Sequence, residues 1–325
     1  MSDKVLIVSF SFEQEPDAFA ELEKGGYTPL LWAQKDRLNA TQTDFVNYWN
    51  TLSEKPCGIV MGADIAVGEE FLSQATGLEA VSLNCAGYDH LDLQAFAQHG
   101  VKVCNVPRQN FSAVADLAFG QIISLMRKIP QGDRSIRAGK WCEGVERGSA
   151  VSGKTIGIMG LGAVGQAVAQ RAKGFDMDII VSSTSQKEEL AQKYGLKYVD
   201  KETFFKTADI IVLCCPANAQ THYVINAETL ALMKNSAVII NPSRGGLVDT
   251  KALINALNTG AIAGAALDVF ETEPMYESEL FTTENTVLTP HIGGLADREI
   301  RNVALKSAQN IISLLQGAKQ QPGIV

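Results

Sequence analysis

The sequence predicts an α/β protein with two Rossmann-like domains, each built on a doubly wound parallel sheet. Short apolar runs alternate with amphipathic stretches along the chain, which is the pattern of parallel strands joined by helices. The chain has 325 residues, 46% of them hydrophobic, and this exceeds what one core usually organises. A glycine-rich turn near residue 160 separates a strand-like run from a helix-like run.

The first third of the chain predicts the strands and helices of one sheet. Strands are expected at the apolar runs 5–10, 58–61, 80–84 and 101–104. Helices are expected at amphipathic stretches such as 17–24 and 92–98. This alternation predicts one βα layer.

The remainder of the chain predicts a second βα layer. Residues 112–127 form a long apolar stretch that is interrupted by Gly120 and predicts a long helix, and the polar stretch 131–149 follows. Strands are expected at 154–159, 178–182, 210–213, 237–240 and 262–267, with helical stretches between them. Residues 296–315 predict a final long helix.

Charge and apolar length argue against nucleic acid and membrane as partners. The chain carries 28 Lys and Arg against 36 Asp and Glu, a net charge of −8, and has no long basic run. No segment approaches the roughly 18 uninterrupted apolar residues of a membrane span. We therefore expect a soluble cytoplasmic protein with a small-molecule ligand.

The cysteine pattern does not indicate a metal site. Six cysteines are present, without a C-x-x-C pair and without a Cys/His cluster of metal-ligand spacing. Cys214 and Cys215 end an apolar run, so we interpret them as buried strand residues rather than redox groups. No metal is expected.

The glycine turn predicts a dinucleotide site. It comprises Gly160, Gly162 and Gly165, with Ala163 and Val164 opening the helix that follows. In such a unit the first glycine permits the tight turn, the second lets a pyrophosphate approach the backbone, and the third allows close packing of helix and strand. The phosphates would then meet free N–H groups at the helix N-terminus.

Several ordered motifs carry a resemblance to one family. They are NCAGYDHLD at 84–92, NVP at 105–107, GLGAVG at 160–165, NPSRGGLVD at 241–249, ALDVFETEP at 266–274 and TPHIGG at 289–294. Together they resemble the D-isomer-specific 2-hydroxyacid dehydrogenases, and specifically the glyoxylate/hydroxypyruvate reductase-like branch, over nearly the whole chain. The family is NAD(P)-dependent and transfers a hydride between the nicotinamide and a small 2-keto acid.

The resemblance also implies a domain arrangement. A dinucleotide-binding domain, 105–290, would be inserted into a substrate-binding domain made of 1–104 and 291–325. The long helix at 112–127 would lie at the two-fold interface of a homodimer.

Three residues match the family's catalytic set. Hydride transfer needs a proton donor for the carbonyl oxygen, and imidazole suits because it titrates near neutral pH, so His291 is the expected donor. Glu273 should accept a hydrogen bond from His291, fix its tautomer and raise its pKa. Arg244 should bind the substrate carboxylate and keto oxygen together. The alternative for His291 is a purely structural histidine, and that for Arg244 is a surface salt bridge. The alternative for Glu273 is a solvated loop carboxylate, with Glu271 as the nearby competitor for its role.

The substrate carboxylate is expected at a backbone cradle formed by Ala86 and Gly87, for which the alternative is a simple strand-to-helix turn. Asp268 resembles the family's aspartate near the nicotinamide, and its alternative is a cap or turn residue. The resemblance implies further cofactor contacts, which are expected at Cys215, Pro216, Ser243, His291 and Gly293.

One segment bears on the choice between the two cofactors. NAD-selective relatives place an acidic residue about 20 residues beyond the glycine turn, and here Ser183 takes that place. Hydroxyls of Ser183, Thr184 and Ser185, together with Lys187, could hold a 2′-phosphate. NADP is therefore the expected cofactor, with NAD as the alternative.

The identity of the substrate stays open. Residues 60–64 contain no arginine or lysine, which argues against a phosphorylated substrate, and glyoxylate, hydroxypyruvate, pyruvate and bulkier keto acids remain. The family's formate-oxidising branch has glutamine in place of Glu273, which argues against that activity. A phosphite-oxidising enzyme with a similar triad and a non-catalytic nucleotide-sensing protein are the alternative functions.

Overall fold

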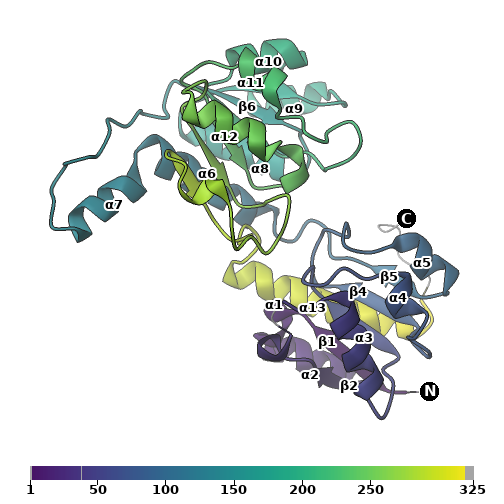
Figure 1. Cartoon of the computed structure of the whole chain (residues 1–325). Helices are drawn as coiled ribbons and strands as arrows, with labels where there is room; N and C mark the ends of the chain where they lie inside the picture. The colour runs from purple at the N-terminus through teal and green to yellow at the C-terminus, as the bar shows by residue number, and fades with distance from the viewer. Residues whose placement is uncertain (1, 38, 319–325) are drawn as a thin grey trace. The chain divides into compact units, whose positions relative to one another are not determined.

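The computed structural model describes residues 2–37 and 39–318, which divide into two compact units (Figure 1). Unit 1 contains the described residues of Met1–Asn110 and Leu295–Val325, and unit 2 is Phe111–Gly294. The domain limits expected from the sequence, 104/105 and 290/291, lie a few residues before these limits.

Unit 1 is built on a parallel sheet with the strand order β2-β1-β3-β4-β5 among the described residues. Its strands are β1 (Lys4–Val8), β2 (Thr28–Leu31), β3 (Gly58–Met61), β4 (Ala80–Leu83) and β5 (Lys102–Cys104). Each strand runs parallel to its neighbours, with Val8 beside Met61 and Met61 beside Leu83. The predicted doubly wound parallel sheet is confirmed for this unit.

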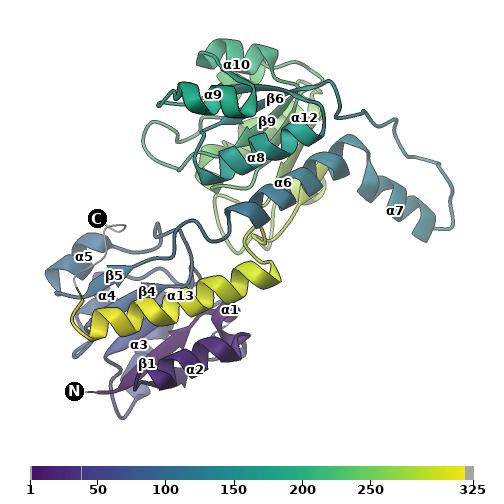
Figure 2. The same cartoon turned by 180° about the vertical axis from the view of Figure 1, so that it is seen from behind.

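Helices cover both faces of the unit 1 sheet (Figures 1 and 2). One face packs against α1 (Phe10–Glu13), α2 (Pro16–Lys24) and α13 (Asp297–Leu315). The other packs against α3 (Gln42–Thr51), α4 (Glu69–Leu72) and α5 (Leu93–Gln98), and η1 (Gln34–Asp36) follows β2. Alternation along β1 explains both cores, because Val5 and Ile7 face one layer and Leu6 and Val8 face the other.

Unit 2 is built on a second parallel sheet, with the described strands in the order β12-β11-β10-β9-β6-β7-β8. Its strands are β6 (Thr155–Met159), β7 (Asp178–Ser182), β8 (Leu196–Tyr198), β9 (Ile210–Leu213), β10 (Val238–Asn241), β11 (Gly264–Leu267) and β12 (Thr286–Leu288). The second predicted sheet is confirmed as well.

Helices also cover both faces of the unit 2 sheet. One face packs against α6 (Phe111–Met126), α8 (Ala163–Gly174) and α9 (Glu188–Tyr194). The other packs against α10 (Lys201–Thr207), α11 (Ala227–Leu232) and α12 (Thr250–Asn258). The short helices η2 (Gly245–Leu247) and η3 (Glu279–Phe281) follow β10 and β11.

The polar stretch 131–149 is partly helical. It overlaps α7 (Ile129–Arg137), which begins with Pro130 in its first turn, a position where proline is tolerated because that amide has no helical partner. Figures 1 and 2 show α7 and the segment after it extending away from the sheet of their own unit. In the described part of the chain, every helix is too short or too polar to span a lipid bilayer.

Candidate active site

Arg244, Glu273 and His291 all follow strands that are neighbours in the unit 2 sheet. β10 precedes Arg244, β11 precedes Glu273 and β12 precedes His291. Because the three strands are parallel, their carboxyl ends meet at one edge of the sheet, which is where α/β sheets bind ligands. The fold therefore gathers residues that lie up to 47 positions apart (291 − 244).

His291 and Glu273 form a hydrogen-bonded pair. The His291 Nδ1 and Glu273 Oε2 atoms are 2.6 Å apart, and the Phe270 amide donates to Glu273 Oε1 at 2.8 Å. The two side chains are 48% and 33% exposed, respectively, so the pair is open to a ligand. With Nδ1–H donating to the carboxylate, Nε2 is the ring nitrogen left to exchange a proton with a substrate.

The pair shifts both pKa values toward the charged forms. The hydrogen bond with the Glu273 carboxylate raises the pKa of His291, and it outweighs the opposite effect of burial. Burial acts to raise the pKa of Glu273, but the hydrogen bond and charge of His291, the Phe270 amide and the charge of Arg244 together lower it. The imidazolium–carboxylate form is therefore favoured.

Arg244 lies in a turn that packs directly against the segment carrying Glu273. The Asn241 side chain donates to the Arg244 carbonyl at 2.9 Å, and Arg244 Nη1 donates to the Ser243 carbonyl at 2.8 Å. At Gly245 a Cβ atom would lie 1.9 Å from the Phe270 carbonyl carbon, so only glycine permits this approach. The positive charge of Arg244 acts to lower the pKa of both Glu273 and His291, which places the guanidinium in their electrostatic environment.

Asp268 is buried and holds the loop that carries His291. Its carboxylate accepts hydrogen bonds from Thr289 Oγ1 at 2.6 Å, the Ile292 amide at 2.9 Å and the Gly293 amide at 2.8 Å. Its backbone carbonyl accepts from the His291 amide at 2.8 Å. Asp268 thus binds the histidine loop rather than capping a helix, the alternative considered from sequence.

The sequence did not single out two supports of this loop. Gln121 of α6 donates from Nε2 to Thr289 Oγ1 at 2.9 Å, so the Thr289 hydroxyl hydrogen is directed to Asp268. The position of Thr289 within the TPHIGG motif was the available signal for its role. Gln121 gave no such signal, because its contact depends on the packing of α6 against the sheet.

The glycine turn has the geometry that a dinucleotide requires. Gly160 has φ of 92°, and a Cβ there would lie 2.9 Å from the Cys214 carbonyl oxygen. A Cβ at Gly165 would lie 2.2 Å from the Gly160 carbonyl oxygen. At Gly162, which precedes α8, a Cβ would meet no described atom within 4 Å. Ala163 and Val164 begin α8, so the turn leaves helix N-terminal amides open to a pyrophosphate.

The segment after β7 lies at the carboxyl edge of the same sheet. Ser183 is half-buried there, and Thr184, Ser185 and Lys187 are exposed. The phenol of Tyr198 on β8 accepts from the Lys187 amide at 3.1 Å and donates to the Lys187 carbonyl at 3.3 Å. Tyr198 was not identified from the sequence, since this contact crosses between strands.

Cys215, Pro216 and Ser243 lie at this carboxyl edge. Ser243 Oγ donates to the Cys215 carbonyl at 2.8 Å, and Thr221 Oγ1 donates to the Pro216 carbonyl at 2.7 Å. Burial raises the pKa of the Cys214 and Cys215 thiols, which keeps them protonated at neutral pH. The described residues contain no group of three or more His, Cys, Asp or Glu side chains able to hold a metal ion.

Ala86 and Gly87 belong to unit 1, where they follow β4. Asn105 Nδ2 donates to the Ala86 carbonyl at 2.7 Å, and the Cys85 thiol donates to the Gly87 carbonyl at 3.1 Å. The Val106 amide donates to the Cys85 carbonyl at 3.0 Å. These contacts hold the turn in place at the carboxyl edge of the unit 1 sheet.

The glycine turn and the His291–Glu273 pair with Arg244 define a dinucleotide-dependent oxidoreductase. A family model described as "D-isomer specific 2-hydroxyacid dehydrogenase, NAD binding domain" matches residues 119–293, more than half of the chain. The chain therefore belongs to the D-isomer specific 2-hydroxyacid dehydrogenase family. It uses a nicotinamide dinucleotide cofactor and reduces a 2-keto acid.

Two glyoxylate reductases are similar to this chain over most of its length. The chain is 42% identical over 258 residues to the glyoxylate reductase of Thermococcus litoralis, covering 77% of this chain and 78% of that one. It is 42% identical over 261 residues to the glyoxylate reductase of Pyrococcus horikoshii, covering 77% of each. These likenesses do not favour a phosphite-oxidising enzyme or a non-catalytic binding protein.

Solved structures agree on the fold. A glyoxylate reductase from Paecilomyes thermophila superposes with a TM-score of 0.84 at 28% identity, covering 98% of this chain and 97% of that one. The apo-structure of D-lactate dehydrogenase from Escherichia coli gives a TM-score of 0.85 at 27% identity, covering 98% and 99%. The α/β architecture expected from the sequence is confirmed.

Proposed function

We propose that His291 donates the proton, Glu273 positions and charges His291, and Arg244 binds the substrate in the reduction of a small 2-keto acid to the D-2-hydroxy acid. The observation that carries this proposal is the 2.6 Å contact between His291 Nδ1 and Glu273 Oε2, made beside the charge of Arg244. This arrangement supplies an imidazolium whose Nε2–H can donate to a substrate, and beside it the planar, permanently charged guanidinium of Arg244.

The proposed step uses these residues in order. A nicotinamide dinucleotide held at the glycine turn and the start of α8 would supply the hydride that C2 of the keto acid receives. As negative charge grows on the keto oxygen, Arg244 stabilises it and His291 Nε2–H transfers its proton, so that an O–H bond forms as the N–H bond breaks. His291 ends as neutral imidazole, while Glu273 still accepts from Nδ1–H.

The remaining proposed contacts hold the two ligands. We propose that the Ala86 and Gly87 amides and Arg244 bind the substrate carboxylate. The pyrophosphate would lie on the glycine turn and the start of α8. Further dinucleotide contacts are proposed at Cys215, Pro216, Ser243, Asp268, His291 and Gly293.

We propose NADP as the preferred cofactor. Ser183 stands where an NAD-selective enzyme would have an acid, so no carboxylate at that position repels a 2′-phosphate. The hydroxyls of Ser183, Thr184 and Ser185 and the ammonium of Lys187 lie on one segment at the carboxyl edge of the sheet. The Tyr198 phenol holds the backbone of Lys187, which orders the end of that segment.

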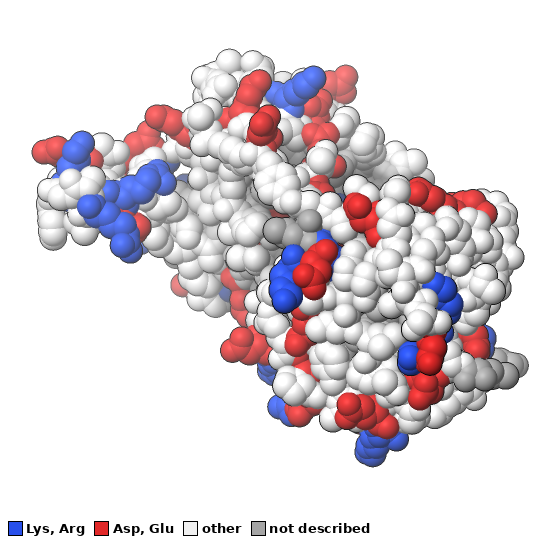
Figure 3. Space-filling view, turned by 60° about the horizontal axis from the view of Figure 1, so that its bottom comes forward, with Lys and Arg blue, Asp and Glu red and all other residues white. Residues whose placement is uncertain are grey.

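Glyoxylate is the first substrate to test, because the relatives at 42% identity are named glyoxylate reductases. We also propose a homodimer through the helix at 112–127, which is α6 in the structure, as the resemblance implies. A cytoplasmic location stays a prediction from the sequence. Exposed apolar side chains on and after α7 support the dimer: Ile129, Ile136 and Trp141 are 51%, 52% and 82% exposed. On the face drawn in Figure 3, Lys and Arg side chains of this region stand beside Asp and Glu.

The function is tested by NADPH oxidation with a panel of 2-keto acids. His291→Ala should lower the rate by about 10² to 10⁴-fold while nucleotide binding stays nearly unchanged. Arg244→Lys should raise KM and lower kcat for the keto acid, because lysine lacks the bidentate geometry of arginine. His99→Ala is the matched control, since His99 also pairs with a glutamate, Glu69 at 3.1 Å, but at the C-cap of α5 in unit 1. Wild-type turnover in His291→Ala would remove His291 from the mechanism.

A further inference from the structure

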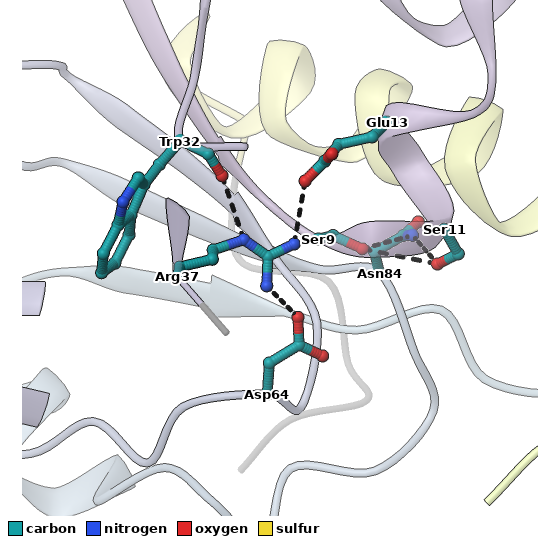
Figure 4. Close-up of polar contacts among 7 residues, drawn as sticks. All are labelled: Ser9, Ser11, Glu13, Trp32, Arg37, Asp64 and Asn84. Carbon is teal, nitrogen blue, oxygen red and sulfur yellow. Dashed lines mark hydrogen bonds and ion pairs between the residues drawn. The ribbon is translucent and has the colours of Figure 1, made fainter. Parts of the chain in front are cut away.

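A buried arginine lies at the carboxyl edge of the unit 1 sheet (Figure 4). Arg37 Nε donates to the Trp32 carbonyl at 3.0 Å and Nη2 donates to Glu13 Oε1 at 3.0 Å. Nη1 forms a short ion pair with Asp64 Oδ2. One guanidinium thus faces two carboxylates, and the cluster Glu13–Arg37–Asp64 carries one net negative charge.

The cluster lies at the carboxyl edge of the sheet near the place where the chain, after β2 on one side of β1, crosses to β3 on the other side. The strand order β2-β1-β3 places this topological switch point between β1 and β3, and ligands of open α/β sheets bind there. Glu13 ends α1, which follows β1, and Asp64 lies in the loop after β3. The Asp64 side chain is 41% exposed, so its charge is felt outside the protein interior.

The loop that carries Asp64 and the turn proposed to bind the substrate carboxylate follow paired strands, β3 and β4. Asn84, the residue before that turn, donates from Nδ2 to Ser9 Oγ at 3.0 Å and to Ser11 Oγ at 2.8 Å (Figure 4). A Cβ at Gly62 would lie 3.5 Å from Ser9 Oγ and 3.0 Å from Asp64 Oδ1. Paired strands are about 5 Å apart, so the Asp64 loop and the carboxylate turn begin roughly one strand spacing from each other, at Met61 and Leu83.

The fold brings to this region a cation that lies outside residues 60–64 in the sequence. No cation occurs at 60–64, but the structure brings Arg37 to Asp64 from the segment after β2. This arginine does not offer a positive charge to a ligand, because Glu13 and Asp64 together outweigh it. A second anionic group on a bound substrate would meet net negative charge.

We propose that the Glu13–Arg37–Asp64 cluster selects substrates by the charge of their side chain. This inference rests on the proposed function, with the carboxylate of the 2-keto acid at Ala86 and Gly87. The cluster disfavours 2-keto acids with a second carboxylate or a phosphate relative to those with an uncharged side chain. Asp64 and Glu13 are therefore specificity-determining residues.

Coulomb repulsion sets the expected size of the effect. Two unit charges about 8 Å apart, at an effective dielectric between about 20 and 40, change affinity by roughly fivefold to thirtyfold. Salt lowers this figure because the pair lies within one Debye length at low ionic strength and is screened at high ionic strength. Discrimination against dianions should therefore weaken as salt is added.

The experiment compares kcat/KM for glyoxylate and hydroxypyruvate with that for oxaloacetate and 2-ketoglutarate. Wild type should favour the first two. Asp64→Asn removes one negative charge with little change of shape, and it should raise the dianion-to-monoanion ratio by about fivefold or more at low ionic strength. Glu13→Gln also removes one negative charge, but from α1. It replaces Asp64→Asn as the test if the Asp64→Asn variant does not fold.

Asp3→Asn is the matched control, because Asp3 precedes β1 and so lies at the opposite, amino edge of the sheet. Its dianion-to-monoanion ratio should equal that of wild type. A wild type that uses dianions and monoanions equally well, or folded Asp64→Asn and Glu13→Gln variants with unchanged ratios, would overturn this inference alone. Reduction of no 2-keto acid would overturn the proposed function and this inference with it.

Discussion

His291 holds its proton to a higher pH than a free imidazole because a carboxylate accepts from Nδ1. The spacing of motifs suggested this contact, but it could not give the network that supports it. Asp268 follows β11, Thr289 follows β12 and Gln121 lies in α6, so the pairing of the two strands and the packing of α6 bring them together. Sequence motifs identify the reacting groups more readily than the groups that hold them.

Glu273→Gln should move the pH dependence of keto-acid reduction. The proton donor must be charged, so kcat/KM should be constant at low pH and fall as pH rises through the raised pKa of His291. An amide stabilises imidazolium less, so this fall should shift to lower pH in the variant. Glu271→Gln is the control, since Glu271 accepts from the Thr250 amide at 3.2 Å and from Tyr223 instead. An unchanged profile in Glu273→Gln would contradict the pairing.

The strands that the sequence did not reveal share a position in the sheets, although the edge strand β5 was expected. Central strands such as β3 and β9 are buried on both faces and read as continuous apolar runs. The unexpected strands β2, β8 and β12 are all at sheet edges, where they are short and partly exposed. β2 even contains Pro29, which an edge strand tolerates. Edge strands gain their conformation from a neighbour, so their own composition says little.

At the first residue of η2, Gly245→Ala should separate two catalytic segments. The new Cβ would lie 1.9 Å from backbone atoms of Phe270, so the Arg244 turn and the Glu273 segment must move apart. A misplacement of about 1 Å costs roughly 10²-fold in kcat/KM, and overpacking costs about 1–3 kcal/mol of stability. Gly246→Ala is the neighbouring control, because its Cβ would meet His222 Nδ1 at an ordinary 3.7 Å. Steady-state kinetics and thermal unfolding would show equal behaviour of the two variants if the close approach were unimportant.

The loop after β7 is expected to set cofactor choice. Ser183→Asp would place a carboxylate where the 2′-phosphate is proposed to bind, so NADPH should lose affinity and NADH should gain a ribose partner. Two unit charges about 4 Å apart repel by roughly 4 kcal/mol at an effective dielectric near 20, an upper figure that salt lowers. The measurement is kcat/KM for both nucleotides at one ionic strength. A wild type that already prefers NADH would contradict the assignment, and so would a variant with an unchanged ratio.

At the scale of the whole molecule, the apolar side chains on and after α7 should govern self-association. Most of α6 is buried within its own unit, whereas Trp141 is 82% exposed. Trp141→Glu should therefore weaken the proposed dimer, because aromatic anchors dominate most interfaces. Analytical ultracentrifugation over a range of concentrations would measure this, with Leu31→Glu, an exposed apolar site on β2, as the control. A monomeric wild type would contradict the proposed dimer, and an equally dimeric Trp141→Glu would contradict the role of Trp141.

The helix α13 has a consequence for the order in which this protein is made. It covers one face of the unit 1 sheet, packing Ala304, Ala308 and Ile311 against the strands. On a ribosome, residues 297–315 emerge after every residue of unit 2. Unit 2 is continuous in sequence and has its core complete by then, while the surface of β3 and β4 against which α13 packs still faces water. Synthesis therefore leaves the first sheet to be finished last, and during that interval its uncovered face is open to aggregation.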